Sequence, residues 1–368
     1  MAFQFLTFDA ALEEAIGHRR HLLLGNGFSI ALFPDRFRYQ SLLEQAVLEG
    51  LFDDFPEIPE AFELLQTTDF EVVLQALVKM TKLIHLYVPE EEPKQSMLRD
   101  AEKLKEALVV ALAGRHPARL SEIVEGQFQN CRNFLLKFAG KGLEKPGCIY
   151  TLNYDLLLYW TLLHEPEGEG EGFHFKPPPA ELLIKHDDGF RNPEDPESPY
   201  VAWDVDGGSN SQNIHFLHGG LHLFDAGTEL QKYCWERAGG IPLMDQIRVA
   251  LDEERYPLFV AEGSSASKLE KILHSGYLVR SYKSFAGICN SRNNAVFVFG
   301  HSLASSDEHI LKLMEAGKFC KLFISLHGTP ADNWNKPIIE RALKIRDVRE
   351  RNDLEVYFYD AASANVWG

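Results

Sequence analysis

The chain has 368 residues, of which 45% are hydrophobic and 25% charged, enough for one large globular domain with insertions or for two domains. Its formal net charge of −17 disfavours nucleic acid as the main partner, because an acidic chain repels phosphate backbones. The apolar runs are much shorter than the roughly 20 residues of a membrane-spanning helix, so no membrane partner is expected.

Five cysteines are scattered along the chain, and no two of them form a CxxC pair. Neither a disulfide framework nor a four-cysteine zinc site is therefore expected. The N-terminal stretch MAFQFLTFDAALEEA has no basic residue before its apolar residues, unlike a secretory signal. Together these features predict a reduced, cytoplasmic protein that needs no metal.

The first 40 residues predict a helix, a strand and a glycine loop. Residues 9–18 form the expected helix, with Asp9 as its N-cap, and HLLL at 21–24 is a short buried strand. GNGFS, at 25–29, is a tight loop that leads into another helix. From 41 to 140, apolar residues recur three and four apart, which indicates a block of helices, one of them capped by Asp69.

The pattern changes after residue 145. Residues 146–165 predict a strand and a helix, and the segment 166–212 is a loop excursion rich in Glu, Gly and Pro. NIHFLHGGLHLFD, at 213–225, predicts a hairpin of two short strands around a Gly-Gly turn. Beyond it, 242–254 and 268–287 each predict a helix.

The C-terminal part alternates strands and helices: NNAVFVFG, DEHILKLMEAG, CKLFISLHG, NKPIIERALKIRDVRE and LEVYFYDA. This alternation predicts a doubly wound, mostly parallel, Rossmann-like α/β fold. Its core comprises 1–40 and 146–368, and 41–145 is an inserted helical subdomain. Ligands bind such sheets beyond the carboxyl ends of the strands, where the polar and glycine motifs of this chain fall.

Two glycine motifs follow predicted strands. Gly25 and Gly27 allow a sharp turn, and the N–H groups of such a loop can cradle a pyrophosphate. Ile30 stands where the dinucleotide fingerprint has its third glycine, so a plain strand-to-helix turn is an equal alternative. In FGHSLASSDEH, Gly300 ends a strand and Asp307 suits a ribose hydroxyl. The alternative there is that Ser305 or Ser306 caps the following helix.

Histidines and a polar strand end supply the candidate catalytic groups. The hairpin predicted around His215, His218 and His222 argues against a shared metal ion, because only alternate strand positions share a face. His218, before the glycine turn, is the candidate general base, whereas the other two are more typical of structural or solvent-facing positions. In TLNYD, Asn153 can orient a water or a substrate hydroxyl, and Asp155 can fix a neighbour or cap the next helix.

In their order along the chain, these motifs resemble those of the sirtuin-like NAD-consuming domain: a glycine loop, T-x-N-x-D, His-Gly and G-x-S. The resemblance spans about 20–330 and rests on Gly25, Gly27, Ser29, Thr151, Asn153, Asp155, His218, Gly219, Gly300 and Ser302. The helical insertion and the tyrosine of TLNYD look more like the bacterial sirtuin-like proteins of phage defence. The deacylases of the family carry a four-cysteine zinc module, which this chain lacks.

The resemblance implies an NAD glycohydrolase that cleaves the nicotinamide–ribose bond to give nicotinamide and ADP-ribose, as an antiphage effector. It implies NAD as substrate and Asn153, His218 and Asp155 as catalytic residues. The NAD-contacting residues would be Gly25, Asn26, Gly27, Phe28, Ser29, Thr151, Gly219, Gly300, His301, Ser302 and Asp307.

Three alternatives stay open from the sequence. One is a sensor that binds NAD or ADP-ribose without turnover, and another is a protein ADP-ribosyltransferase or deacylase. The third is a nucleotide-binding α/β domain of unrelated chemistry. Uncontrolled NAD hydrolysis harms a cell, so a regulatory protein partner or a homo-oligomer is expected to restrain the enzyme.

Overall fold

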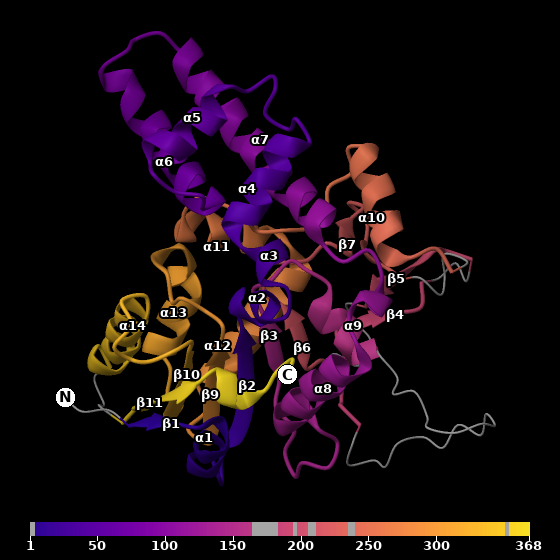
Figure 1. Cartoon of the computed structure of the whole chain (residues 1–368), viewed down its shortest axis with the longest axis vertical. Coiled ribbons are helices and arrows are strands. Elements are labelled where there is room, and N and C mark those ends of the chain that lie inside the picture. Colours follow the sequence, from indigo (N-terminus) through magenta and orange to yellow (C-terminus); the bar gives the residue numbers. More distant parts are fainter. Residues whose placement is uncertain (1–3, 164–182, 194–196, 205–210, 235–239, 350–352) are drawn as a thin grey trace.

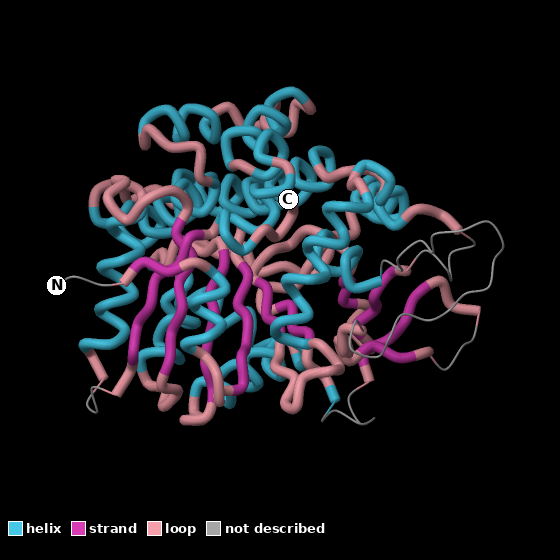
Figure 2. Tube along the Cα trace, turned by 60° about the horizontal axis from the view of Figure 1, so that its bottom comes forward, coloured by secondary structure: helices cyan, strands magenta, loops and turns pink. Residues whose placement is uncertain are grey.

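The computed structural model describes residues 4–163, 183–193, 197–204, 211–234, 240–349 and 353–368. Within them, seven strands form one parallel sheet in the order β1-β11-β10-β9-β2-β3-β6 (Figures 1 and 2). The strands are β1 (Phe5–Leu6), β2 (Arg19–Leu24), β3 (Ile149–Thr151), β6 (Ile214–Phe216), β9 (Asn294–Phe299), β10 (Lys321–Leu326) and β11 (Glu355–Asp360). The predicted Rossmann-like α/β fold is confirmed.

Helices cover both faces of this sheet. In β9, Phe297 and Phe299 belong to one hydrophobic core, whereas Val296 and Val298 belong to the other. The first core includes α1 (Phe8–Glu14) and α8 (Glu125–Ala139), and the second includes α12 (Gly276–Cys289), α13 (Glu308–Glu315) and α14 (Asn335–Asp347). Because side chains of successive residues enter opposite cores, both faces of the sheet are buried, and the sequences of its strands contain unbroken apolar runs.

The strand order places a topological switch point beside β2. The chain passes from β2 to β3 and β6 on one side, then returns to β9, β10 and β11 on the other. The register aligns the last residues of four strands in one row: Leu24, Thr151, Phe216 and Phe299. The segments that follow these four strands therefore leave the sheet at one edge, which is where ligands bind in folds of this type.

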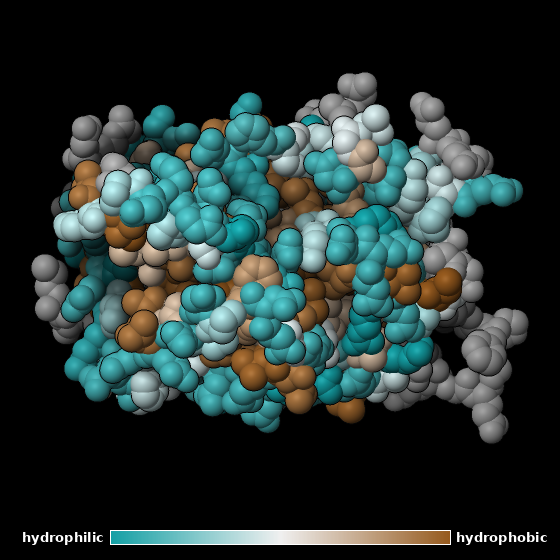
Figure 3. Space-filling model, turned by 90° about the horizontal axis from the view of Figure 1, so that it is seen from above, coloured by the Kyte–Doolittle hydropathy of each residue, from teal (hydrophilic) through white to brown (hydrophobic). Residues whose placement is uncertain are grey.

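Four helices of the predicted insertion stand together at the top of the molecule (Figure 1). They are α4 (Tyr39–Leu48), α5 (Glu57–Leu64), α6 (Phe70–Leu83) and α7 (Glu92–Arg115), and α2 (Gly27–Leu32) and α3 (Pro34–Phe37) lead into them. Asp69 caps α6 as predicted, because its side chain accepts from the Glu71 N–H. Seen from above, this end of the molecule is largely hydrophilic, with scattered apolar side chains (Figure 3). By contrast α8 packs on the sheet, where Phe134 contacts Phe299.

The hairpin predicted over 213–225 is wrong. β6 pairs with β3 in the parallel sheet, whereas β7 (Leu223–Asp225) pairs with β8 (Leu230–Tyr233) in a separate antiparallel sheet of order β4-β5-β8-β7. Gly219, with φ of 80°, bridges to Phe259 rather than closing a two-residue turn. Of the predicted 166–212 excursion, 166–182, 194–196 and 205–210 lie outside the described residues. The described part supplies β4 (Phe190–Arg191) and β5 (Tyr200–Trp203).

Two predicted helices also differ in the structure. Thr7, not Asp9, caps α1, because the Thr7 hydroxyl accepts from the Ala10 N–H. The segment predicted as a single helix over 268–287 divides at Ser275, whose backbone is extended, into α11 (Ser265–His274) and α12. The predicted helices α9 (Leu157–Leu163) and α10 (Leu243–Asp252) are present. Among the described residues, no helix has both the length and the apolar character needed to cross a bilayer.

Buried histidines are expected to make this fold sensitive to acid. Burial lowers the pKa of His21, His215 and His222 to about 3 and that of His116 to about 4. Their unfolded pKa is about 6.5, so below this pH the unfolded chain takes up protons that the folded chain excludes. The free energy of unfolding should have its highest value above pH 6.5 and decrease towards pH 4. Each histidine should contribute a decrease of up to about 1.4 kcal/mol for each pH unit. Urea unfolding at pH 7.5, 6 and 5 measures this slope, and a constant free energy would contradict it.

Candidate functional site

Ser29, Asn153 and Asp155 form a buried hydrogen-bonded group, here called the serine cluster. Ser29 lies on α2 just after β2, and the other two residues follow β3. The Ser29 hydroxyl donates to Asp155 Oδ2 at 2.5 Å and accepts from Asn153 Nδ2 at 2.9 Å. Asp155 Oδ1 accepts from the Leu157 N–H, so Asp155 both fixes a neighbour and caps α9. Side-chain hydrogen bonds thus join the glycine loop after β2 to TLNYD after β3.

The serine cluster holds the Asn153 amide in one orientation. The Thr151 hydroxyl oxygen accepts from the Asn153 N–H at 3.0 Å, and Ser29 accepts from its side chain. Burial raises the pKa of Asp155, and the hydrogen bond from Ser29 opposes this rise. A fixed amide of this kind can present a donor or an acceptor to a ligand hydroxyl or to water.

The two glycine loops pack against each other. The Gly27 N–H donates to the Gly300 carbonyl oxygen at 2.7 Å. A methyl group on Gly25 would lie 2.7 Å from that oxygen, and one on Gly27 would lie 2.6 Å from Gly300 Cα. Gly25 and Gly27 are therefore required for the contact between the loops after β2 and β9. The loop after β9 occupies the space beside these glycines, where the sequence analysis placed a pyrophosphate.

A second polar group, the histidine cluster, consists of His218, His301, Asp307 and His309. His218 Nε2 lies 3.1 Å from His309 Nε2 and 3.9 Å from Asp307 Oδ1. His301 Nδ1 accepts from the Leu303 N–H at 2.9 Å, so its Nε2 carries the proton and donates to Asp307 Oδ2 at 3.0 Å. Burial lowers the pKa of His218 well below its usual value, which keeps this imidazole neutral.

A buried lysine joins the histidine cluster to the helical insertion. Lys268 Nζ, on α11, lies 2.8 and 2.9 Å from the two carboxylate oxygens of Glu71 and 2.9 Å from Asp307 Oδ1. Burial alone would lower the pKa of Lys268, but Glu71 and Asp307 raise it. Burial alone would raise the pKa of Asp307, but Lys268 and His301 hold it well below its usual range. Glu71 comes from the first turn of α6, so the insertion contributes a charge to the site.

With both clusters described, the chain can be compared with known proteins. A family model described as a domain of unknown function, DUF4917, matches residues 22–367. The chain belongs to the DUF4917 family. No curated protein matches it. The matched region contains the parallel sheet from β2 onward, the helical insertion and both clusters, so the whole arrangement belongs to the DUF4917 domain.

The other predicted site residues of this DUF4917 chain have different surroundings. Phe28 is buried against the ring of Trp367, and Asn26 Nδ2 donates to a backbone carbonyl at 3.1 Å. Ser302 is exposed. His215 and His222 are buried and stack on Tyr150 and Tyr159, so of the two expected positions, structural or solvent-facing, they have the structural one.

Sequence reasoning missed several residues of the DUF4917 site and misplaced a helix cap. Lys268, Glu71 and His309 were not singled out, because on an amphipathic helix they look like ordinary exposed residues. The DEH stretch that contains Asp307 and His309 was the available signal. Ser305 and Ser306 do not cap α13, whose N-cap position is Asp307.

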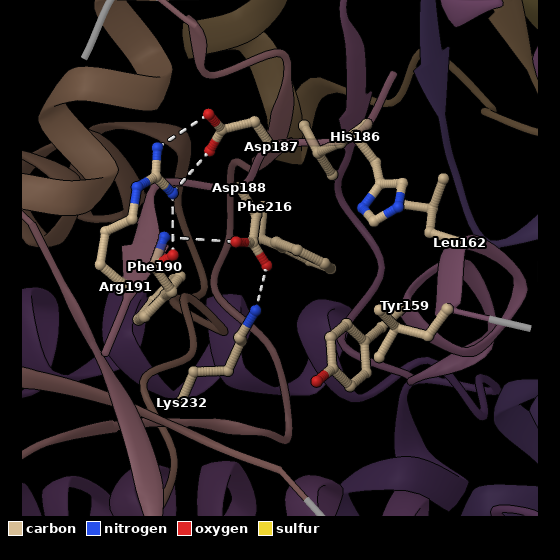
Figure 4. A pocket seen from close by; sticks show the side chains of 11 residues that line it. Tyr159, Leu162, His186, Asp187, Asp188, Phe190, Arg191, Phe216 and Lys232 are labelled. Carbon is tan, nitrogen blue, oxygen red and sulfur yellow. Dashed lines mark hydrogen bonds and ion pairs between the residues drawn. The ribbon is translucent and has the colours of Figure 1, made fainter. Parts of the chain in front are cut away.

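A cavity of about 350 Å³ lies away from both clusters, between α9, β6 and the antiparallel sheet (Figure 4). Its charged side chains are already paired. Lys232 Nζ lies 2.5 Å from Asp188, and the Arg191 guanidinium makes two bonds, of 2.8 and 2.9 Å, to Asp187. None of the predicted site residues lines this cavity. The candidate site of the DUF4917 domain is therefore the edge of the sheet that carries the two clusters.

Proposed function

We propose that this DUF4917 protein binds NAD at the switch point of its sheet and hydrolyses the nicotinamide–ribose bond. The observation that carries the proposal is the hydrogen-bonded group of Ser29, Asn153 and Asp155 beyond the carboxyl ends of β2 and β3. His218 comes two residues after Phe216, as Asn153 comes two residues after Thr151, and Phe216 and Thr151 are paired in register. The motifs behind the sirtuin-like resemblance thus leave the sheet at one edge.

Each residue has a defined task in this reaction. Cleavage of the N-glycosidic bond builds positive charge on the ribose, as in glycoside hydrolysis. Asn153, fixed by Ser29, orients the attacking water or a ribose hydroxyl. His218 is neutral and accepts a proton from that water or hydroxyl. Asp155 holds Ser29, and through it the Asn153 amide, in place.

Access to the site requires movement, because Ser29, Asn153 and Asp155 are buried. The ion pairs of Lys268 with Glu71 and Asp307 connect α11, α6 and the loop after β9 across the histidine cluster. A dinucleotide enters only when such covering segments separate. A regulatory partner or self-association that favours the closed state would hold the enzyme inactive until a trigger releases it, which agrees with the need to restrain NAD hydrolysis.

The test is release of nicotinamide and ADP-ribose from NAD by the full chain. Asn153→Ala should reduce turnover at least about 100-fold, because the positioned amide is lost. The matched control is Asn294→Ala, which removes a buried asparagine at the opposite end of the sheet, where its Nδ2 donates to the Ile288 carbonyl at 2.8 Å. This control should keep its turnover.

The outcomes separate the alternatives. Unchanged turnover in Asn153→Ala would refute the assigned role of this residue. NAD that binds without nicotinamide release would indicate a sensor. Labelled NAD that modifies a protein instead of yielding free ADP-ribose would indicate a transferase.

A further inference from the structure

We propose that His218, Asp307 and His309 form a binding site for one divalent first-row transition metal ion, such as zinc. The three ligand atoms lie within 4.8 Å of one another, with His218 Nε2 3.1 Å from His309 Nε2 and 3.9 Å from Asp307 Oδ1. Zinc binds nitrogen and oxygen at about 2.0–2.2 Å, which sets tetrahedral ligand atoms roughly 3.3 Å apart. Small side-chain shifts would therefore bring all three ligand atoms to bonding distance and leave the fourth position to a water molecule.

The contact between the two imidazoles itself calls for a proton or a cation. Two ring nitrogens at 3.1 Å cannot face each other with both lone pairs, so one N–H or one cation lies between them. Both side chains are buried, at 2% and 3% exposure, and imidazole is the commonest metal ligand in proteins. A metal ion would bind the lone pairs of both Nε2 atoms at once. A proton would instead be bound to one Nε2 and form a hydrogen bond to the lone pair of the other.

Outer partners orient two of the three ligands. His301 donates to Asp307 Oδ2, and Oδ1, which accepts from Lys268 Nζ at 2.9 Å, has a second lone pair for the metal. His309 Nδ1 lies 3.2 Å from Ser265 Oγ, so this nitrogen can carry the proton while Nε2 binds the metal. Hydrogen bonds of this kind to the far side of histidine and carboxylate ligands are typical of metal sites.

The chemistry of the ligands selects the class of ion. Two imidazoles and one carboxylate suit zinc, cobalt or iron, whereas magnesium and calcium prefer oxygen alone. Asp307 and Glu71 carry two negative charges against the single positive charge of Lys268, so a dication is tolerated, although Lys268 weakens its binding. The prediction that no metal is needed rested on the scattered cysteines and on the hairpin around the three histidines, and the structure replaces only the hairpin.

Metal binding has a consequence that rests on the proposed function. His218 cannot accept a proton while its Nε2 binds a metal ion. Zinc should therefore inhibit nicotinamide release, and a chelator should restore it. The metal site would act as a switch on NAD hydrolysis.

The test is titration of the chelator-treated full chain with Co²⁺, followed by its visible absorption and by competition with Zn²⁺. One equivalent should give the bands of a low-coordinate site with nitrogen ligands. His309→Ala should lower the affinity at least about 100-fold, since even outer partners contribute 10–100-fold. His274→Ala, which removes an exposed histidine of α11, should leave the affinity unchanged.

Absence of cobalt binding by the wild-type chain would overturn the proposal, whatever the variants do. So would equal affinity in His309→Ala or, should that variant fail to fold, in His218→Asn. Metal binding without NAD turnover would refute only the proposed function. Turnover without metal binding would refute only this inference.

Discussion

Lys268→Met is expected to lower the free energy of unfolding by about 3–5 kcal/mol, because it leaves two largely buried carboxylates without their cation. The Lys268 side chain is 1% exposed and contacts both Glu71 and Asp307. Methionine fills a similar volume, so the decrease in the free energy of unfolding would come from the missing charge and not from a cavity. Urea denaturation at constant pH measures it.

Lys271→Met is the matched control for this substitution. Lys271 lies on the same helix, and its side chain is 36% exposed and pairs with Glu262 at 3.2 Å. Partly exposed ion pairs contribute at most about 1 kcal/mol, so this variant should remain near the wild type. Adding Glu71→Gln to Lys268→Met should recover part of the loss. Equal effects of the two lysine substitutions would show that the buried ion pairs do not hold α6 to α11.

Gly219→Ala is expected to cost about 2–5 kcal/mol and to displace His218. The glycine has φ of 80°, which costs an L-residue about 1–2 kcal/mol. Its new methyl group would lie 1.9 Å from the Leu258 carbonyl oxygen, and that clash adds about 1–3 kcal/mol. The Leu258 oxygen cannot easily withdraw, because it accepts from the Gly220 N–H, while the Val260 N–H donates to the His218 carbonyl. Thermal and urea unfolding measure the loss.

Gly227→Ala separates the two contributions. Gly227 has φ of 81°, and a methyl group there would meet nothing within 4 Å. This variant should lose only the backbone cost of about 1–2 kcal/mol. If both glycine variants lost the same stability, the clash with the Leu258 carbonyl oxygen would contribute nothing to the free energy of unfolding. The close approach to Leu258 would then not be the reason for a glycine after His218.

Periodicity and turn chemistry predicted the parts of the fold that depend on local sequence. The strands β2, β9 and β10 could be predicted from their apolar runs alone, because both faces of the sheet are covered. The Asp69 cap of α6 could be predicted from local sequence as well. The hairpin prediction failed because two short strands beside a Gly-Gly pair satisfy the local pattern whether or not they pair with each other. β6 instead pairs with β3, which is distant in the sequence, whereas β7 pairs with β8 across the short loop at 226–229.

Ser29, Asn153, Asp155 and His218 could be named from the sequence, because polar side chains just after apolar strands mark the ligand edge of a parallel sheet. The sequence by itself thus determined the fold class and the strand ends that carry these residues. The tertiary structure alone decided that Glu71 pairs with the buried Lys268 and that His309 faces His218. It also decided that Gly25 and Gly27 serve the contact with Gly300. These features depend on which helix lies against which loop, and an amphipathic pattern shows only that a helix has a buried face, not what that face meets.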